Sequence, residues 1–116
     1  MSMHEFSIAL NIIEIAEEEC LKSRASSIRE INLKIGTLSG VVPDALEFAL
    51  TEAVKGSLLQ DANIHFKLVP GKAQCNNCKS IFPINQFYDL CPNCQNYKTT
   101  LLEGKELQII SIVVND

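Results

Sequence analysis

Apolar residues near the start of the chain recur with the period of an α-helix. The stretch EFSIALNIIEIAEEECLKS places apolar residues at the i, i+3, i+4 and i+7 spacing of one helical face. These residues are Phe6, Ala9, Leu10, Ile13, Ala16 and Cys20. Ile8, Ile12 and Ile15 widen the same face. We therefore expect a long helix that buries one broad side and pairs Glu18 with Lys22 on its wet side.

Alternation of apolar and polar residues predicts strands further along. SIREINLKIG alternates isoleucine and leucine with polar residues and ends at Gly36. NIHFKLVP alternates in the same way, with Ile64, Phe66 and Leu68 on its buried side and a solvated His65 on the other. The run ELQIISIVV near the C-terminus is strongly β-prone and long enough for a third strand.

A second helix is predicted in PDALEFALTEAVKG, between the first two strands. Pro43 suits its first position, acidic residues favour its N-terminal end, and Gly56 suits its C-terminal stop. Its inner face would consist of Leu46, Ala49, Leu50 and Ala53. The stretch TLSGVV before it is expected to be a loop because of its Ser-Gly pair.

From Gly71 to about Thr100 the apolar pattern gives way to asparagine, proline and cysteine. The element order predicts an α+β fold, with two helices packed on one face of a three-stranded sheet and an inserted zinc-ribbon-like module. The expected domains are an α/β domain over residues 1–70 and 101–116, and a metal-binding module over residues 71–100. The small core of the module would consist of Ile81, Phe82, Ile84, Phe87 and Tyr88.

Composition narrows the function classes. The chain has 116 residues, of which 47% are hydrophobic, which suits one domain with a smaller insertion and excludes a disordered chain. A net charge of −4 argues against a general nucleic-acid binder. The near-apolar stretch from Ile8 to Ala16 is interrupted by Asn11 and Glu14, so neither a membrane span nor a signal peptide is expected. We therefore expect a cytoplasmic protein.

Four of the five cysteines form two CxxC pairs. CNNC contains Cys75 and Cys78, and CPNC, twelve residues further on, contains Cys91 and Cys94. Two such pairs can place four sulfurs around one ion, and this tetrahedral set suits zinc. A pair of redox CxxC motifs and a rubredoxin-like iron site are the alternatives, although redox motifs usually begin a helix. Cys20 is expected to be a small core residue.

A zinc ion with four thiolates has no open position for water, so the site is expected to be structural rather than hydrolytic. A module of this size cannot build a stable core unaided, so the metal should hold it folded. Zinc ribbons often bind nucleic acid. Here the three lysines and one aspartate between Gly71 and Thr100 give a charge of +2, which four thiolates and one zinc ion together cancel, and no arginine is present to read bases.

Several stretches together resemble the HypA-type nickel metallochaperones. They are MHEFS at 3–7, IGTLSGVVPDALEFAL at 35–50, the CNNC and CPNC pairs, and GKELQI at 104–109. The resemblance covers nearly the whole chain. It implies a protein of nickel–iron hydrogenase maturation, and in some bacteria of urease maturation, that binds Ni(II) at its N-terminus. It also implies delivery to a maturation GTPase and the hydrogenase large-subunit precursor, with urease accessory proteins as further partners.

The resemblance also implies the roles of individual residues. His4 is the side-chain ligand of nickel, and Glu5 contributes through its backbone amide or through a partner contact. The four paired cysteines bind a structural zinc. No catalysis belongs to this family, and the chain shows no nucleophile–base set or phosphate-binding glycine loop, so we expect no enzyme. In the family MHE usually opens the chain, whereas Met1 and Ser2 precede it here.

The start MSMHEFS has two physical interpretations. If Met1 is removed, the amine of Ser2, the backbone nitrogens of Met3 and His4 and the His4 imidazole can surround one ion in a plane. Four nitrogens in a square suit Ni(II) and also Cu(II). Alternatively, Ser2 caps the helix and Glu5 reaches back to it.

Two further functions compete with nickel delivery. The chain could be a zinc-ribbon adaptor that docks proteins without nickel transfer, or a small ribbon domain associated with nucleic acid. We expect neither a nucleic-acid nor a membrane partner.

Overall fold

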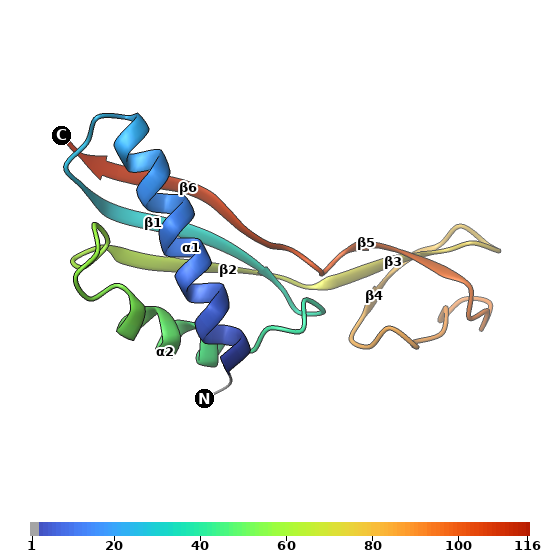
Figure 1. Cartoon of the computed structure of the whole chain (residues 1–116). Helices are drawn as coiled ribbons and strands as arrows, with labels where there is room; N and C mark the ends of the chain where they lie inside the picture. Colours follow the sequence, from blue (N-terminus) through green and yellow to red (C-terminus); the bar gives the residue numbers. More distant parts are fainter. Residues whose placement is uncertain (1–2) are drawn as a thin grey trace. The chain divides into compact units, whose positions relative to one another are not determined.

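The computed structural model of the chain describes residues 3–116. These residues form two helices and six strands (Figure 1). In chain order the elements are α1 (Met3–Lys22), β1 (Ser27–Gly36), α2 (Pro43–Ala53), β2 (Asn63–Val69), β3 (Gly71–Cys75), β4 (Ile81–Ile84), β5 (Thr99–Glu103) and β6 (Leu107–Asn115). Neither helix within this range is long and apolar enough to cross a membrane.

The chain divides into two compact units. The helical unit comprises the described residues through Leu33 together with Val41–Lys67 and Gln108–Asp116. The cysteine unit comprises Lys34–Gly40 and Leu68–Leu107. Each unit is therefore built from segments that are separated in the sequence.

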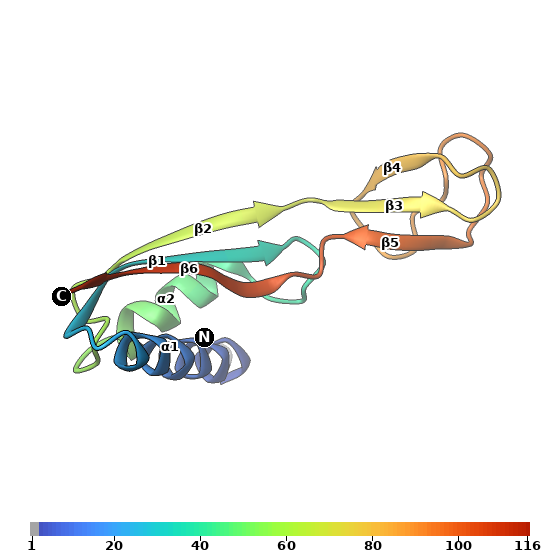
Figure 2. The ribbon, with the colours of Figure 1, turned by 90° about the horizontal axis from the view of Figure 1, so that it is seen from above.

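The helical unit consists of two helices on one face of a sheet, as the sequence pattern predicts. The strand order is β2-β1-β6, and Figure 2 shows α1 and α2 on the same side of these strands. The central strand β1 buries Ile31 and Leu33, and α2 buries Leu46, Ala49 and Leu50. Burial of this apolar face stabilises the unit, because apolar area removed from water is worth roughly 25 cal/mol per Å².

Helix α1 buries a narrower strip than its sequence suggests. Ala9, Ala16 and Cys20 are fully buried, whereas Leu10 and Ile15, which the pattern places inside, are 49% and 43% exposed. The predicted pair of Glu18 with Lys22 is wrong, because Lys22 Nζ lies 3.5 Å from Glu19 Oε1.

Some further details bear on the expectations. Helix α2 ends at Ala53, which is only half-buried, and Gly56 lies in the following turn with φ +79°. Leu68, expected to be buried, is 53% exposed. His65 is more than half exposed, as expected, and its Nε2 lies 3.1 Å from Glu30 Oε1.

The cysteine unit contains a second antiparallel sheet that the sequence pattern did not reveal. Its strand order is β4-β3-β5, and the pairing with β4 runs from Gly71 opposite Ile84 to Gln74 opposite Ile81. Phe82 and Ile84 are buried as predicted. Ile81, Phe87 and Tyr88, which were also assigned to the core, are exposed. The cysteines themselves, Ala73 and Leu38 complete the core.

Leu38 reaches this core from the loop TLSGVV, some thirty residues earlier in the chain. The N–H of Leu38 donates to the carbonyl of Gly104 at 2.7 Å, and the N–H of Thr37 donates to the carbonyl of Val69 at 2.9 Å. A Cβ at Gly36 would lie 2.0 Å from the Gly104 oxygen, so only glycine fits there. The segment Lys34–Gly40 is therefore an integral part of the cysteine unit.

We expect Leu38→Ala to destabilise the cysteine unit by about 2–4 kcal/mol, because Leu38 is only 8% exposed and its loss leaves a cavity. Hydrogen exchange should rise within residues 68–107 and stay unchanged in α1. Val42→Ala is the matched control, because Val42 is 58% exposed in the same connection. Equal effects of the two variants would show that Leu38 does not support the core.

Candidate metal centre

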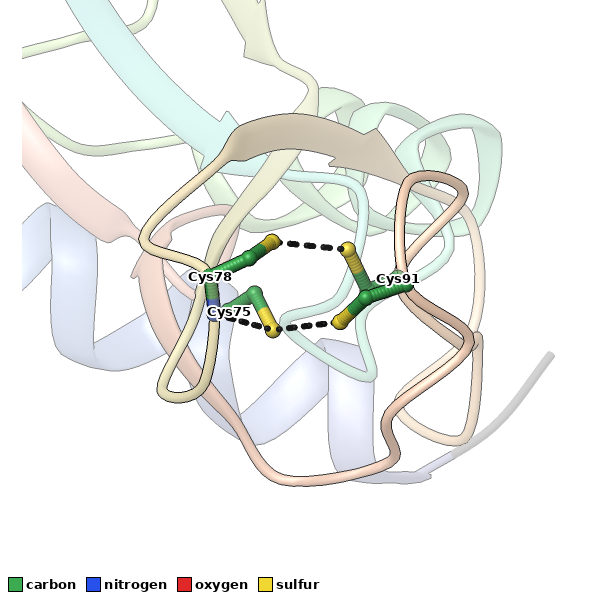
Figure 3. A group of neighbouring side chains, drawn as sticks. Cys75, Cys78 and Cys91 are labelled. Atoms are coloured by element: carbon green, nitrogen blue, oxygen red, sulfur yellow. Dashed lines mark hydrogen bonds between the residues drawn. The ribbon is translucent and has the colours of Figure 1, made fainter.

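The four paired cysteines converge in the cysteine unit. Cys75 ends β3 and Cys78 follows in the next turn, while Cys91 and Cys94 lie in the connection between β4 and β5. Their sulfur atoms all lie within 4.8 Å of one another, and the chain segments face each other across the cluster (Figure 3). The sulfurs of Cys75 and Cys94 are 3.5 Å apart, and those of Cys78 and Cys91 are 3.6 Å apart.

These separations suit a tetrahedral metal ion. Zn–S bonds of about 2.3 Å imply sulfur–sulfur edges of about 3.8 Å. All five cysteines of the chain are free thiols, so no disulfide competes for these sulfurs. Four soft sulfur donors at this spacing fit zinc or a rubredoxin-like iron, and they leave no position for a reacting water.

Each CxxC loop forms a knuckle, the first over residues 75–78 and the second over residues 91–94. The two knuckles have the same backbone hydrogen bonding. The N–H of Lys79 donates to the carbonyl of Cys75 at 3.0 Å, and the N–H of Gln95 donates to that of Cys91 at 2.8 Å. Lys79 and Gln95, each just after the second cysteine of its knuckle, have φ values of 67° and 65°. This left-handed turn reverses the chain behind each pair of sulfurs.

Within the first knuckle, backbone N–H groups point at the first sulfur. Those of Asn77 and Cys78 donate to Cys75 Sγ at 3.4 and 3.5 Å. In the second knuckle the N–H groups of Cys94 and Asn93 make the corresponding bonds to the Cys91 sulfur. Backbone donors of this kind stabilise a thiolate and fix its orientation toward a metal.

Burial divides the four thiols into two kinds. Cys75 and Cys91 are fully buried, whereas Cys78 and Cys94 are partly exposed. The hydrogen bond between Cys78 and the Ser80 hydroxyl, followed by that from the Asn93 amide, lowers the pKa of Cys78 from 9.0 to about 5.

The pKa values of two other thiols also move. The Asn77 amide, followed by a backbone N–H, lowers the pKa of Cys94. Burial raises the pKa of Cys91. The partly exposed sulfurs of Cys78 and Cys94 therefore carry negative charge more readily than the buried sulfur of Cys91.

The residues predicted to bind nickel lie at the start of α1. His4 is exposed, whereas the Glu5 side chain is 5% exposed. Successive residues of a helix point about 100° apart, so the two side chains diverge. Met3 is the first helical residue, and Ser2 lies outside the described residues.

Sequence reasoning missed Asn77, Asn93 and Ser80 as neighbours of the sulfurs. A signal for two of them was present, because each knuckle has asparagine directly before its second cysteine, in CNNC and in CPNC.

Comparison with known proteins gives consistent results. A family profile described as "Hydrogenase/urease nickel incorporation, metallochaperone, hypA" matches residues 3–114. The "Hydrogenase maturation factor HypA" of Parabacteroides distasonis is 46% identical over 97% of this chain and 97% of its own. The protein of the same name from Geobacter sulfurreducens is 38% identical over 97% of this chain and 99% of its own.

Solved structures support the fold. The solution structure of the Ni metallochaperone HypA from Helicobacter pylori has a TM-score of 0.68 and 23% identity, over 96% of this chain and 97% of its own. A second solution structure of a HypA protein has a TM-score of 0.72 and 24% identity, over 98% of both chains.

Proposed function

Since the chain belongs to the HypA family of hydrogenase and urease nickel-incorporation metallochaperones, we propose that it binds Ni(II) at its N-terminus and delivers it during nickel–iron hydrogenase maturation. The observation that carries this proposal is the family match, which begins at the MHE sequence and extends over residues 3–114. The chain is a maturation factor and not an enzyme.

The cysteine cluster is proposed to hold a structural zinc through Cys75, Cys78, Cys91 and Cys94. The sulfur separations and the N–H groups directed at the sulfurs support this assignment. The bound ion would cross-link the two knuckles, in a unit whose own apolar core is small. We accordingly propose that residues 71–100 form the zinc module, and that residues 1–70 and 101–116 form the nickel-binding domain.

The nickel ligands are proposed to be the His4 imidazole with the nitrogens of His4, Met3 and the Ser2 amine. Exposure of His4 in the first turn of α1 supports access to an ion. The Glu5 side chain is buried, which favours a contribution from Glu5 through its backbone. Because a Ser2 that binds nickel cannot also cap the helix, nickel should loosen or shift the first turn of α1.

The proposed partners follow from the family. They are a maturation GTPase and the hydrogenase large-subunit precursor, with urease accessory proteins where urease is the client, all in the cytoplasm. The competing proposal is a zinc-ribbon adaptor that docks proteins without carrying nickel.

Nickel titration of the zinc-loaded chain tests the proposal. We expect a second-metal site of micromolar strength or tighter, about −8 kcal/mol or better. Absence of nickel binding would favour the adaptor. Salt-sensitive retention on DNA or RNA would instead favour a nucleic-acid role.

A further inference from the structure

The asparagines of the two knuckles make crossed contacts with the sulfurs. Asn77 Nδ2, in the first knuckle, donates to Cys94 Sγ in the second at 3.6 Å. Asn93 Nδ2, in the second knuckle, donates to Cys78 Sγ in the first at 3.5 Å. Each asparagine thus precedes the second cysteine of its own knuckle and contacts the second cysteine of the other.

The sulfurs that receive these amides are the two partly exposed ones. Cys75 and Cys91 are buried and receive backbone N–H groups, whereas Cys78 and Cys94 are partly exposed. For Cys78 and Cys94 the side-chain amides take the place that water would otherwise occupy. N–H donors reduce the charge that a thiolate presents to an attacking electrophile or a competing proton.

The contacts also join the two knuckles without the metal. The Cα atoms of Asn77 and Asn93 belong to loops separated by the whole of β4 in the sequence. Asn93 Nδ2 also lies 3.3 Å from Ser80 Oγ, which itself lies 3.1 Å from Cys78 Sγ. The Asn93 amide therefore contacts both the Cys78 sulfur and the Ser80 hydroxyl beside it.

We propose that Asn77 and Asn93 are positioning residues that form a reciprocal clasp across the metal site, shield the thiolates of Cys94 and Cys78, and slow loss of the metal. This inference rests on the proposed zinc site. Partners of metal ligands typically change metal affinity by about 10–100-fold when removed. We expect zinc to leave Asn77→Ala or Asn93→Ala about tenfold faster than the unchanged protein.

Alkylation of the zinc-loaded protein with iodoacetamide, mapped by mass spectrometry, gives a crossed pattern if the clasp exists. Asn77→Ala should increase the labelling rate of Cys94, and Asn93→Ala should increase that of Cys78. A merely structural role of either asparagine in its own loop would increase labelling in that same knuckle. Increased labelling of the same knuckle, or no increase, would overturn the proposal.

An isosteric variant separates charge from shape. Asn77→Asp keeps the size of the side chain but places a carboxylate against the Cys94 thiolate, so it should release zinc faster than Asn77→Ala. Retention of zinc at the rate of the unchanged protein would show that only shape matters and would overturn the clasp. Asn76→Ala is the matched control, because the Asn76 side chain accepts a hydrogen bond from the Thr100 hydroxyl at 2.8 Å and lies in the same knuckle.

The zinc content of the unchanged protein distinguishes failure of the clasp from failure of the proposed zinc site. One zinc per chain with unaltered release from both alanine variants would overturn the clasp and leave the zinc site standing. A chain that binds no zinc would overturn both.

Discussion

Replacement of Cys91 by serine is expected to abolish zinc binding and to unfold the cysteine unit while both helices persist. Cys91 is fully buried in the core cluster of that unit, so the variant loses a metal ligand and buries a hydroxyl. Structural zinc contributes on the order of 10 kcal/mol to the folding of small domains. A unit with a core this small has no comparable source of stability.

Metal analysis and hydrogen exchange measure this result. Zinc content should fall from one per chain to none, and exchange protection should vanish within residues 68–107. The far-UV signal of α1 and α2 should remain, because their packing partners in the helical unit are β1, β2 and β6. Complete loss of the helical signal would show that the helical unit depends on the metal.

Cys20→Ala is the matched control for this prediction. Cys20 is equally buried, but it lies in α1, and its thiol donates to the Ala25 carbonyl at 3.7 Å. The variant should keep its zinc. Zinc loss from it would mean that the effect of Cys91→Ser is not specific to the metal site.

Replacement of His4 by alanine is expected to remove the nickel site. Loss of the imidazole should weaken nickel binding from micromolar to millimolar or beyond, a change of about 4 kcal/mol. Calorimetry on the zinc-loaded chain measures the affinity. His65→Ala is the control, because His65 is the second of the two histidines and pairs with Glu30 on the sheet.

The geometry of the nickel complex has its own readouts. A yellow, diamagnetic complex would indicate a square plane of nitrogens, and affinity should fall as the pH drops, because protons compete for the amide and imidazole nitrogens. Mass spectrometry of the intact chain establishes whether Met1 is removed. Unchanged affinity after acetylation of the amino terminus would exclude the amine as a ligand.

Local patterns predicted most of the helical unit. Both helices, the strands β1 and β2 and most of the inner face of α2 follow from apolar spacing, and β6 follows from its β-prone residues. The exposure of side chains at the edges of the apolar face of α1 did not follow from the spacing. Leu10 and Ile15 are exposed although the spacing places them inside, because exposure depends on how α1 packs against the rest of its unit, and spacing along one helix contains no such information.

The cysteine unit was predictable in its ligands and not in its framework. The CxxC spacing indicated four converging sulfurs, which the structure brings together. Strands β3, β4 and β5 have only four or five residues each, too few for a period to emerge from Gln, Thr and Pro. The role of Leu38 depends on contacts between distant segments, so no local pattern could reveal it.

Each unit consists of segments that are separated in the sequence, and this determines when each unit can complete its fold during translation. The sequence passes from one unit to the other four times, after Leu33, Gly40, Lys67 and Leu107. The ribosome therefore makes Lys34–Gly40 well before the strands that this segment joins, and it makes β6 last. The cysteine unit cannot close before residue 107, and the helical unit cannot close before its final strand emerges. A chimaera that exchanges the cysteine unit must accordingly transplant two separate segments together, Lys34–Gly40 and Leu68–Leu107.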